Sequence, residues 1–411
     1  MFHENSDKNK FGYYSVGEFK TYSKFEAILL AQNSAKPVIW HFNDLVFSSY
    51  DWTKEPAESI TDIYARRARQ IREKYDYLVL MYSGGADSTN VLRTFIDNGI
   101  LIDEICSVHE YEGIKDRHGY HTGEILNSAI PLVKDLIPNG SKTRYRLVDS
   151  SQHQYDALTS LSVDQRDESY YEYNIANNLA NLKRLRVREY IEDYKKIIDS
   201  GKRLCLVWGE AKPQTRWSAK QQCHEFVFEE QSYDMIGNVT YQRENHPGYH
   251  DEMFYHSADC PELIAKQAHL CLWHLKNPGL NPGYLTEKNS VPATIRSQFG
   301  DFNILNPDIS QVETFYNGKI WTLTKSALHS IIYPGQGKII YDQGKNANRL
   351  YHPRDEWLRK AAIDDSTKWY QGFLRVMENI SEEWKIQPQG KIKYSIRKMT
   401  NQYPLENNSG I

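Results

Sequence analysis

The sequence predicts an α/β fold, in which helices cover a doubly wound, mostly parallel sheet that carries N-terminal and C-terminal elaborations. Two observations predict it. Four short apolar runs, at residues 77–82, 101–109, 144–149 and 204–208, alternate with helical patterns, which is the order of a βαβ sheet with right-handed crossovers. The first run also lacks any alternation of apolar and polar residues, as expected of a parallel strand buried on both faces.

The chain exceeds one average domain in length, at 411 residues, and its patterns divide it into three parts. Residues 1–58 are predicted to form an N-terminal elaboration with two short strands, and residues 59–276 contain the predicted sheet. The turn-rich stretch Asn277-Pro-Gly-Leu-Asn-Pro-Gly283 is typical of a joint between subdomains. Residues 277–411 are therefore expected to form a C-terminal subdomain of unknown role.

Helical patterns with recognisable ends fill the spaces between the predicted strands. Ser59 is placed to cap a helix over residues 60–75, because its hydroxyl can accept from a first-turn N–H group. Pro131 is expected to kink or end a helix that begins near residue 124. Gly201 is placed to end a long helix that begins near residue 174, and a further helix is expected over residues 261–276.

The loop after the first strand reads Ser83-Gly84-Gly85-Ala86-Asp87-Ser88. Two consecutive glycines let the backbone turn tightly and approach a ligand with no Cβ in the way. Ser88 and Thr89 are placed to cap the next helix, whose free N–H groups and positive dipole end suit an anion such as phosphate. A glycine turn that binds nothing is the alternative, but the order of strand, Ser-Gly-Gly-x-Asp-Ser and helix favours a phosphate site.

This motif resembles the PP-loop of the N-type ATP pyrophosphatases, the adenine nucleotide alpha hydrolase-like superfamily that includes asparagine, argininosuccinate, GMP and NAD synthetases. It differs from the Walker loop, because no Lys follows its last Gly. The nearest similarity is to the asparagine-synthetase-like branch, and the chain also resembles PP-loop proteins of large bacteriophages. The resemblance covers residues 77–110 closely and residues 60–213 more loosely.

The resemblance implies cleavage of ATP between its α and β phosphates, with Mg²⁺, to give an adenylated acceptor and pyrophosphate. Ser83, Gly84, Gly85, Ala86 and Ser88 would hold the pyrophosphate through N–H and hydroxyl groups. Asp87 would organise Mg²⁺ or the loop. PP-loop enzymes usually hold adenine at the end of the second strand, so His109 is a candidate for the adenosine pocket.

A second glycine follows the fourth predicted strand, as in asparagine synthetase. Gly209 and Glu210 match that motif, and Glu210 is a candidate ligand of Mg²⁺. Lys212 and Pro213 depart from the acidic pair expected next. Lys212 could instead neutralise charge on the leaving pyrophosphate. A purely structural role for this turn is an equal alternative, because glycines commonly end strands.

Composition limits the location and the partners of the protein. The net charge of −3 excludes a globally basic nucleic-acid binder, although one face of the helix over residues 60–75 carries five basic residues. That face could attract nucleic acid or be ordinary solvated surface. Five scattered cysteines without a CxxC motif favour a reducing compartment. With no apolar run of membrane-spanning length, the chain is expected to be cytoplasmic and to have no membrane partner. The five basic residues on the helix over residues 60–75 are Arg66, Arg67, Arg69, Arg72 and Lys74.

The predicted function is an ATP-dependent, AMP-forming ligase or synthetase that activates an acceptor for transfer of an amide or amine. The acceptor is an amino acid, a nucleotide or a nucleic acid. Phe2 stands where one class of glutaminase needs Cys, so nitrogen would come from free ammonia, an amine or an ammonia-supplying partner. Assembly of this protein into a homo-oligomer is also left open by the sequence.

Two other functions and one metal site remain as alternatives. A sulfur-transfer or phosphoadenylylsulfate-reductase-like enzyme would use a similar sheet and loop but needs an exposed reactive Cys. A nucleotide-sensing module that binds nucleic acid would use the basic helix. The constellation His256, Cys260, His269, Cys271 and His274 contains residue types that zinc prefers, but its spacing has no paired knuckles, which favours core packing.

Overall fold

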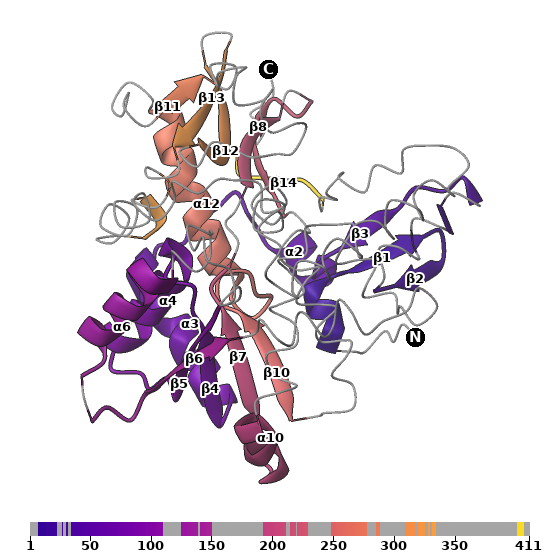
Figure 1. Ribbon diagram of the computed structural model, residues 1–411. Helices are drawn as coiled ribbons and strands as arrows, with labels where there is room; N and C mark the ends of the chain where they lie inside the picture. Colours follow the sequence, from indigo (N-terminus) through magenta and orange to yellow (C-terminus); the bar gives the residue numbers. More distant parts are fainter. Residues whose placement is uncertain are drawn as a thin grey trace, which may run out of the picture.

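The computed structural model describes about half of the chain, in several separate segments. These comprise residues 7–22, 27, 30–31, 34–109, 125–138, 140–149, 192–210, 214–218, 220–228, 248–277, 285–287, 309–316, 319–324, 328, 331–333 and 401–406. Figure 1 shows their arrangement, with the central sheet in the lower half of the view and helices α3, α4 and α6 beside it.

A parallel sheet forms the centre of the molecule (Figure 1). Its order is β10-β7-β4-β5-β6, and all four neighbouring pairs are parallel. The chain starts at the central strand β4, moves outward through β5 and β6, and returns to the other side of β4 at β7. The fold class predicted from sequence, an α/β doubly wound sheet, is confirmed. The strands are β4 (Tyr77–Met81), β5 (Glu104–His109), β6 (Arg144–Asp149), β7 (Leu204–Trp208) and β10 (Tyr249–Met253).

In the central sheet, the strand predictions differ from the structure at three places. β4 ends at Met81 rather than at residue 82. β5 begins at Glu104 rather than at residue 101. The edge strand β10 was not predicted, because its sequence Tyr-His-Asp-Glu-Met lacks an apolar run. Its two carboxylates are nevertheless buried, since the indole N–H of Trp208 donates to Asp251 at 2.8 Å and Arg67 pairs with Glu252 at 2.9 Å.

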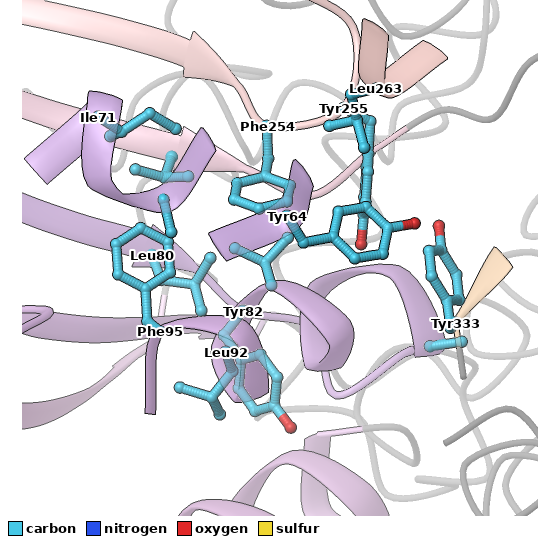
Figure 2. Close-up of a cluster of buried hydrophobic side chains, with 14 of the residues drawn as sticks. Tyr64, Ile71, Leu80, Tyr82, Leu92, Phe95, Phe254, Tyr255, Leu263 and Tyr333 are labelled. Carbon is cyan, nitrogen blue, oxygen red and sulfur yellow. The ribbon is translucent and has the colours of Figure 1, made fainter. Parts of the chain in front are cut away.

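Both faces of the sheet are covered, as its apolar strands require. On β4, Leu78 and Leu80 face one core, whereas Val79 faces the other. Figure 2 shows part of the first core, where Leu80 lies near Phe95. Helices α3 (Ile60–Lys74), α4 (Ala86–Asp97) and α6 (Ile130–Leu136) build the first core. Helix α10 (Glu192–Asp199) contributes to the second core, and α12 (Pro261–Lys276) contributes to both.

The helix ends follow simple local rules. The Ser59 hydroxyl caps α3 by accepting from the N–H of Asp62 at 3.2 Å, as predicted. Gly201, at φ +84°, ends α10 by donating its N–H to Ile198, whereas the part of that predicted helix before residue 192 lies outside the described residues. Pro131 does not end its helix, as the sequence allowed. It lies in the first turn of α6, just after the π-helical turn η2 (Ile125–Ala129), where a missing N–H costs no hydrogen bond.

The N-terminal part packs on the second face of the sheet. After the 3₁₀ turn η1 (Asp7–Phe11), strands β1 (Tyr13–Val16), β2 (Phe19–Thr21) and β3 (Ile39–His41) form an antiparallel sheet in the order β2-β1-β3. Helix α2 (Asp44–Ser49) follows. Its Phe47 lies in the same core as Val79 and Leu206 of the central sheet. The three-part division of the chain stays a prediction.

Two small antiparallel sheets complete the described fold. One has the order β14-β9-β8 and the other the order β11-β13-β12. Among the described segments, no helix combines the length and apolarity that crossing a membrane would need. The strands are β8 (Gln214–Ser218), β9 (Cys223–Val227), β14 (Tyr403–Pro404), β11 (Leu285–Glu287), β12 (Ile309–Tyr316) and β13 (Lys319–Thr324).

Candidate nucleotide-binding site

The Ser-Gly-Gly-Ala-Asp-Ser segment lies at the carboxyl end of the central strand. Residues 82–85 connect β4 to α4, and Ala86 is the first residue of that helix. The chain order reverses between β4 and β7, which are hydrogen-bonded neighbours. In doubly wound sheets, ligands bind outside the carboxyl ends of the strands at this switch point. The topology thus places the loop where such folds bind nucleotides.

Two serine hydroxyls hold the loop in shape. The N–H of Gly85 donates to the Ser83 hydroxyl at 3.2 Å, and the two hydroxyls of Ser83 and Ser88 lie 3.2 Å apart. Ser88 also accepts from the N–H of Ser83 at 3.4 Å and donates to the carbonyl of Gly85 at 3.3 Å. The two hydroxyls that are expected to contact phosphate therefore also order the turn. The backbone N–H groups of this turn would bind the same phosphate.

Gly84 is required for a reason that the sequence did not reveal. Its φ is +81°, and a Cβ built on it would lie 2.6 Å from the backbone nitrogen of Ala129 in η2. The Ser128 hydroxyl donates to the carbonyl of Gly84 at 3.1 Å. A neighbouring helical turn, rather than a ligand, therefore occupies the space left by the missing side chain, and any larger residue would strain the loop.

The start of α4 has no side-chain cap, contrary to the expectation for Ser88 and Thr89. The N-cap residue is Gly85, and no side chain accepts from the first turn among the described residues. Thr89 instead pairs its hydroxyl with that of Tyr82 at 3.0 Å. Helix N-termini of this kind favour anions, because their first N–H groups lack intrahelical acceptors and their dipole end is positive.

Two tyrosines from distant parts of the chain fix Asp87. The Tyr333 hydroxyl donates to its carboxylate oxygen Oδ1 at 2.6 Å, and the Tyr255 hydroxyl donates to its backbone carbonyl at 2.7 Å. Asn90 in turn donates to the Tyr255 hydroxyl at 3.0 Å. Burial raises the pKa of both tyrosines well above the ordinary value, so both stay protonated donors. Tyr333 is not among the residues predicted from the sequence, because no local motif distinguishes it.

The second glycine motif contacts the loop directly. A Cβ on Gly209 would lie 3.0 Å from the Cα of Ser88 and 3.2 Å from the carbonyl oxygen of Asp87. Glu210 is the next residue in the chain. Lys212 lies outside the described residues. The structure therefore brings Gly209 to the predicted loop, while the roles of Glu210 and Lys212 stay predictions.

His109 ends β5, where its backbone is in register with Asp149 of β6. Its side chain is outside the part that the structure describes, so its predicted place in an adenosine pocket is untested. It does lie at the carboxyl end of the strand next to β4, which is the side of the sheet that carries the loop.

The described residues contain no cluster of three or more metal-ligating side chains. The roles of Asp87 and Glu210 as ligands of Mg²⁺ stay predictions, and proteins usually hold this ion through one or two carboxylates together with substrate phosphates. Contacts within the fold account for two residues of the constellation over residues 256–274. His269 bonds the carbonyl of Trp52 at 2.9 Å, whereas Cys271 lies in the other core.

The basic residues of α3 are largely paired with carboxylates of this chain. Arg66 pairs with Glu58 and Arg72 with Asp103, while Lys74 pairs with Glu252. Arg67 is only 1% exposed, so the interpretation of this face as ordinary solvated surface is wrong at that residue. These contacts do not favour a nucleic-acid surface on α3, because the cations already have partners.

A serine, a histidine and an aspartate also line up in the N-terminal part. His41 lies 2.8 Å from the Ser15 hydroxyl through Nε2 and 2.7 Å from Asp44 through Nδ1. These distances match a nucleophile with its base. Ser15, however, is 6% exposed and lies within β1, and Asp44 also accepts from the N–H of Phe42. We interpret the three side chains as a link between β1, β3 and α2.

Comparisons with known proteins add little to this geometry. No family model and no curated protein matches the chain. Among solved structures, the chain is similar to an NAD⁺ synthetase from Burkholderia pseudomallei, with a TM-score of 0.23 and 12% sequence identity. The match spans 40% of this chain and 57% of the synthetase. Values this low carry no information on activity or substrate.

Proposed function

We propose that this protein cleaves ATP between its α and β phosphates and transfers AMP to an acceptor, which a nucleophile then attacks. One observation carries the proposal. The Ser-Gly-Gly-Ala-Asp-Ser loop leaves the central strand at the switch point of the sheet and opens α4, with Gly209 packed on Ser88. A strand, a glycine turn and a helix N-terminus in this arrangement suit a polyphosphate.

The residues present fit a nucleotide with its cation. Backbone N–H groups of the loop and the hydroxyls of Ser83 and Ser88 would hold the pyrophosphate part. Asp87 and Glu210 would hold Mg²⁺, whose chemistry here is to neutralise phosphate charge. Lys212 would neutralise charge on the leaving pyrophosphate, and His109 would lie beside the adenosine.

The chain's contribution would be positioning and charge stabilisation, with no covalent enzyme intermediate. In the first step, an acceptor oxygen attacks the α phosphorus, and the bond to the bridging oxygen breaks. The electron pair of that bond leaves with pyrophosphate. In the second step, an amine or ammonia displaces AMP from the activated acceptor.

The sulfur alternative receives no support from the cysteines. All five are buried, and burial raises the pKa of each thiol. A sulfur-transfer enzyme needs an accessible thiolate, which a raised pKa suppresses. The identity of the acceptor, an ammonia-supplying partner and a homo-oligomer all remain proposals, as does a cytoplasmic location.

The test is product analysis with α-labelled ATP, Mg²⁺ and a pool of amino acids, ammonia and nucleic acids. Wild type should form AMP and pyrophosphate, and Asp87→Ala should lose at least about a hundredfold in rate, as expected for a lost electrostatic group. Asp97→Ala is the matched control, because Asp97 is an exposed aspartate at the far end of the same helix. Formation of ADP and phosphate by wild type would refute the proposal. Omitting pool components one at a time would then identify the acceptor.

A further inference from the structure

A short segment far along the chain packs against the candidate loop. Leu328, Ile331, Ile332 and Tyr333 are buried, with Ile332 and Tyr333 at 0% exposure. All four belong to the core that also contains Val91 of α4. The segment comes from residues 277–411, the part to which the sequence assigned no role. Its burial beside α4 brings that part of the chain to the nucleotide site.

Hydrogen bonds hold this segment at Ile332 and at Tyr333. Gln267 of α12 donates to the Tyr64 hydroxyl at 2.8 Å, and Tyr64 of α3 donates to the carbonyl of Ile332 at 2.6 Å. The next residue, Tyr333, donates to the carboxylate of Asp87 at 2.6 Å. Figure 2 shows Tyr64, Tyr255 and Tyr333 grouped beside the apolar core. The segment therefore connects two helices of the domain to the loop.

The bond to Asp87 is of the strong, orienting kind. At 2.6 Å it falls in the range of hydrogen bonds from a hydroxyl to a carboxylate, which are roughly twice as strong as neutral ones. The ring of Tyr333 is fully buried and lies 5.5 Å from the ring of Tyr255, so the hydroxyl has little freedom to move. An ionised carboxylate has about four acceptor sites, so the bond from Tyr333 uses only part of that capacity.

We propose that Tyr333 is a positioning residue, which holds the Asp87 carboxylate in the orientation that binds the cation accompanying ATP. The inference rests on the proposed function, since it concerns the same site. It also gives the C-terminal part a role, because this part would supply a group that orders the nucleotide loop.

The test compares Tyr333→Phe with wild type in two assays. One measures the rate of AMP formation against Mg²⁺ concentration at saturating ATP. The other measures binding of Mn²⁺ with α,β-methylene-ATP, which is not cleaved, by titration calorimetry. Tyr333→Phe keeps the packed ring and removes only the donor. It should raise the metal concentration for half-maximal rate, and the dissociation constant for Mn²⁺, by about tenfold, as expected for a lost hydrogen bond to a charged group.

Tyr194→Phe is the matched control. The Tyr194 hydroxyl donates to the carboxylate of Glu104 at 2.6 Å and its side chain is fully buried, but Glu104 begins β5 rather than lying at the loop. A structural role alone would make both variants lose stability while keeping the metal dependence of wild type. The proposal requires that only Tyr333→Phe changes that dependence.

Tyr64→Phe provides a second approach if Tyr333→Phe does not fold. It removes the donor to Ile332 and should shift the metal dependence in the same direction by a smaller factor. Unchanged metal dependence in a folded Tyr333→Phe, with wild type forming AMP, would overturn this inference and leave the proposed function intact. A wild type that neither forms AMP nor binds the ATP analogue would overturn both.

Discussion

Gly209 touches Ser88. A Cβ on Gly209 would lie 3.0 Å from the Cα of Ser88, a residue 121 positions earlier in the chain, and 3.0 Å from Cγ2 of Val91. Two glycine-containing turns, one after β4 and one after β7, thus meet at the same edge of the sheet. This contact explains why the fourth apolar strand ends in a glycine, and it joins the two motifs that the sequence placed far apart.

Gly209→Ala should therefore displace the start of α4. The added methyl group must move the backbone of Ser88, which is less able to yield than a flexible side chain. We expect a loss of about 1–3 kcal/mol in the free energy of unfolding, as for other overpacked sites. The affinity for ATP should also fall, because the displaced N–H groups belong to the proposed phosphate site. Chemical denaturation and nucleotide titration measure the two effects.

Gly201→Ala is the control for this substitution. Gly201 has φ +84°, and none of the described residues comes within 4 Å of the position that an added methyl group would take. Alanine there should cost roughly 1–2 kcal/mol of stability from backbone strain alone, with no change in ATP affinity. Equal ATP affinities for Gly209→Ala and wild type would argue against contact between the second glycine and a working phosphate site.

Glu252→Gln should make the protein less stable at neutral pH. Burial alone raises the pKa of Glu252, but Arg67, Lys10 and Lys74 outweigh it and hold the pKa well below its ordinary value. The Tyr75 hydroxyl also donates to this carboxylate, at 2.6 Å. Removing its charge takes from the buried Arg67 its closer ionic partner and leaves only Asp259, at 3.9 Å, which should cost about 3 kcal/mol at pH 7.

The cost of Glu252→Gln should depend on pH in a defined direction. A carboxylate with a lowered pKa in the folded state stabilises the fold above its unfolded pKa, about 4.3 for Glu, and this stabilisation is lost as the pH falls toward the folded value. The difference between wild type and Glu252→Gln should therefore shrink below about pH 4.3. Urea unfolding at pH 7, 5 and 3 measures it. A difference that is constant over this range would contradict an ionised Glu252.

Cysteine replacement should leave catalysis unchanged. Cys260 is the N-cap residue of α12 and is fully buried, 3.7 Å from an Arg66 nitrogen. Cys260→Ala, like Cys223→Ala, should keep the rate of AMP formation within about twofold, because neither thiol is an accessible thiolate. Loss of AMP formation in a stably folded Cys260→Ala protein would revive the sulfur-transfer alternative.

Neutralising the outer basic residues of α3 should not change binding to nucleic acid. Arg66 already pairs with Glu58, while Arg69 is exposed. Fluorescence anisotropy with a single-stranded oligonucleotide, at several salt concentrations, should give the same weak binding for wild type and for Arg66→Gln with Arg69→Gln. The logarithm of the binding constant falls linearly with the logarithm of the salt concentration. If this slope became less steep in the variant by about 0.7 for each lost phosphate contact, α3 would instead be a nucleic-acid surface.

Much of the fold follows from local sequence signals. An apolar run of five residues gave β7 at its observed bounds, and β6 was predicted at its observed bounds although half of its residues are charged. Helix α12 was also predicted over its full length. The edge strand β10 could not be predicted in this way. Its Glu252 is buried in an ion pair with Arg67 of α3. A pattern of apolar residues contains no information on such a pairing.

The sequence by itself determined the parallel sheet and the glycine loop after its central strand, because buried strands need apolar runs and a tight turn needs glycine. Only the tertiary structure decided what surrounds that loop. Ala129 fills the space beside Gly84, Gly209 contacts Ser88, and Tyr333 bonds to Asp87. These contacts join residues that are 45, 121 and 246 positions apart, and they form only when the chain packs, so no local pattern can reveal them.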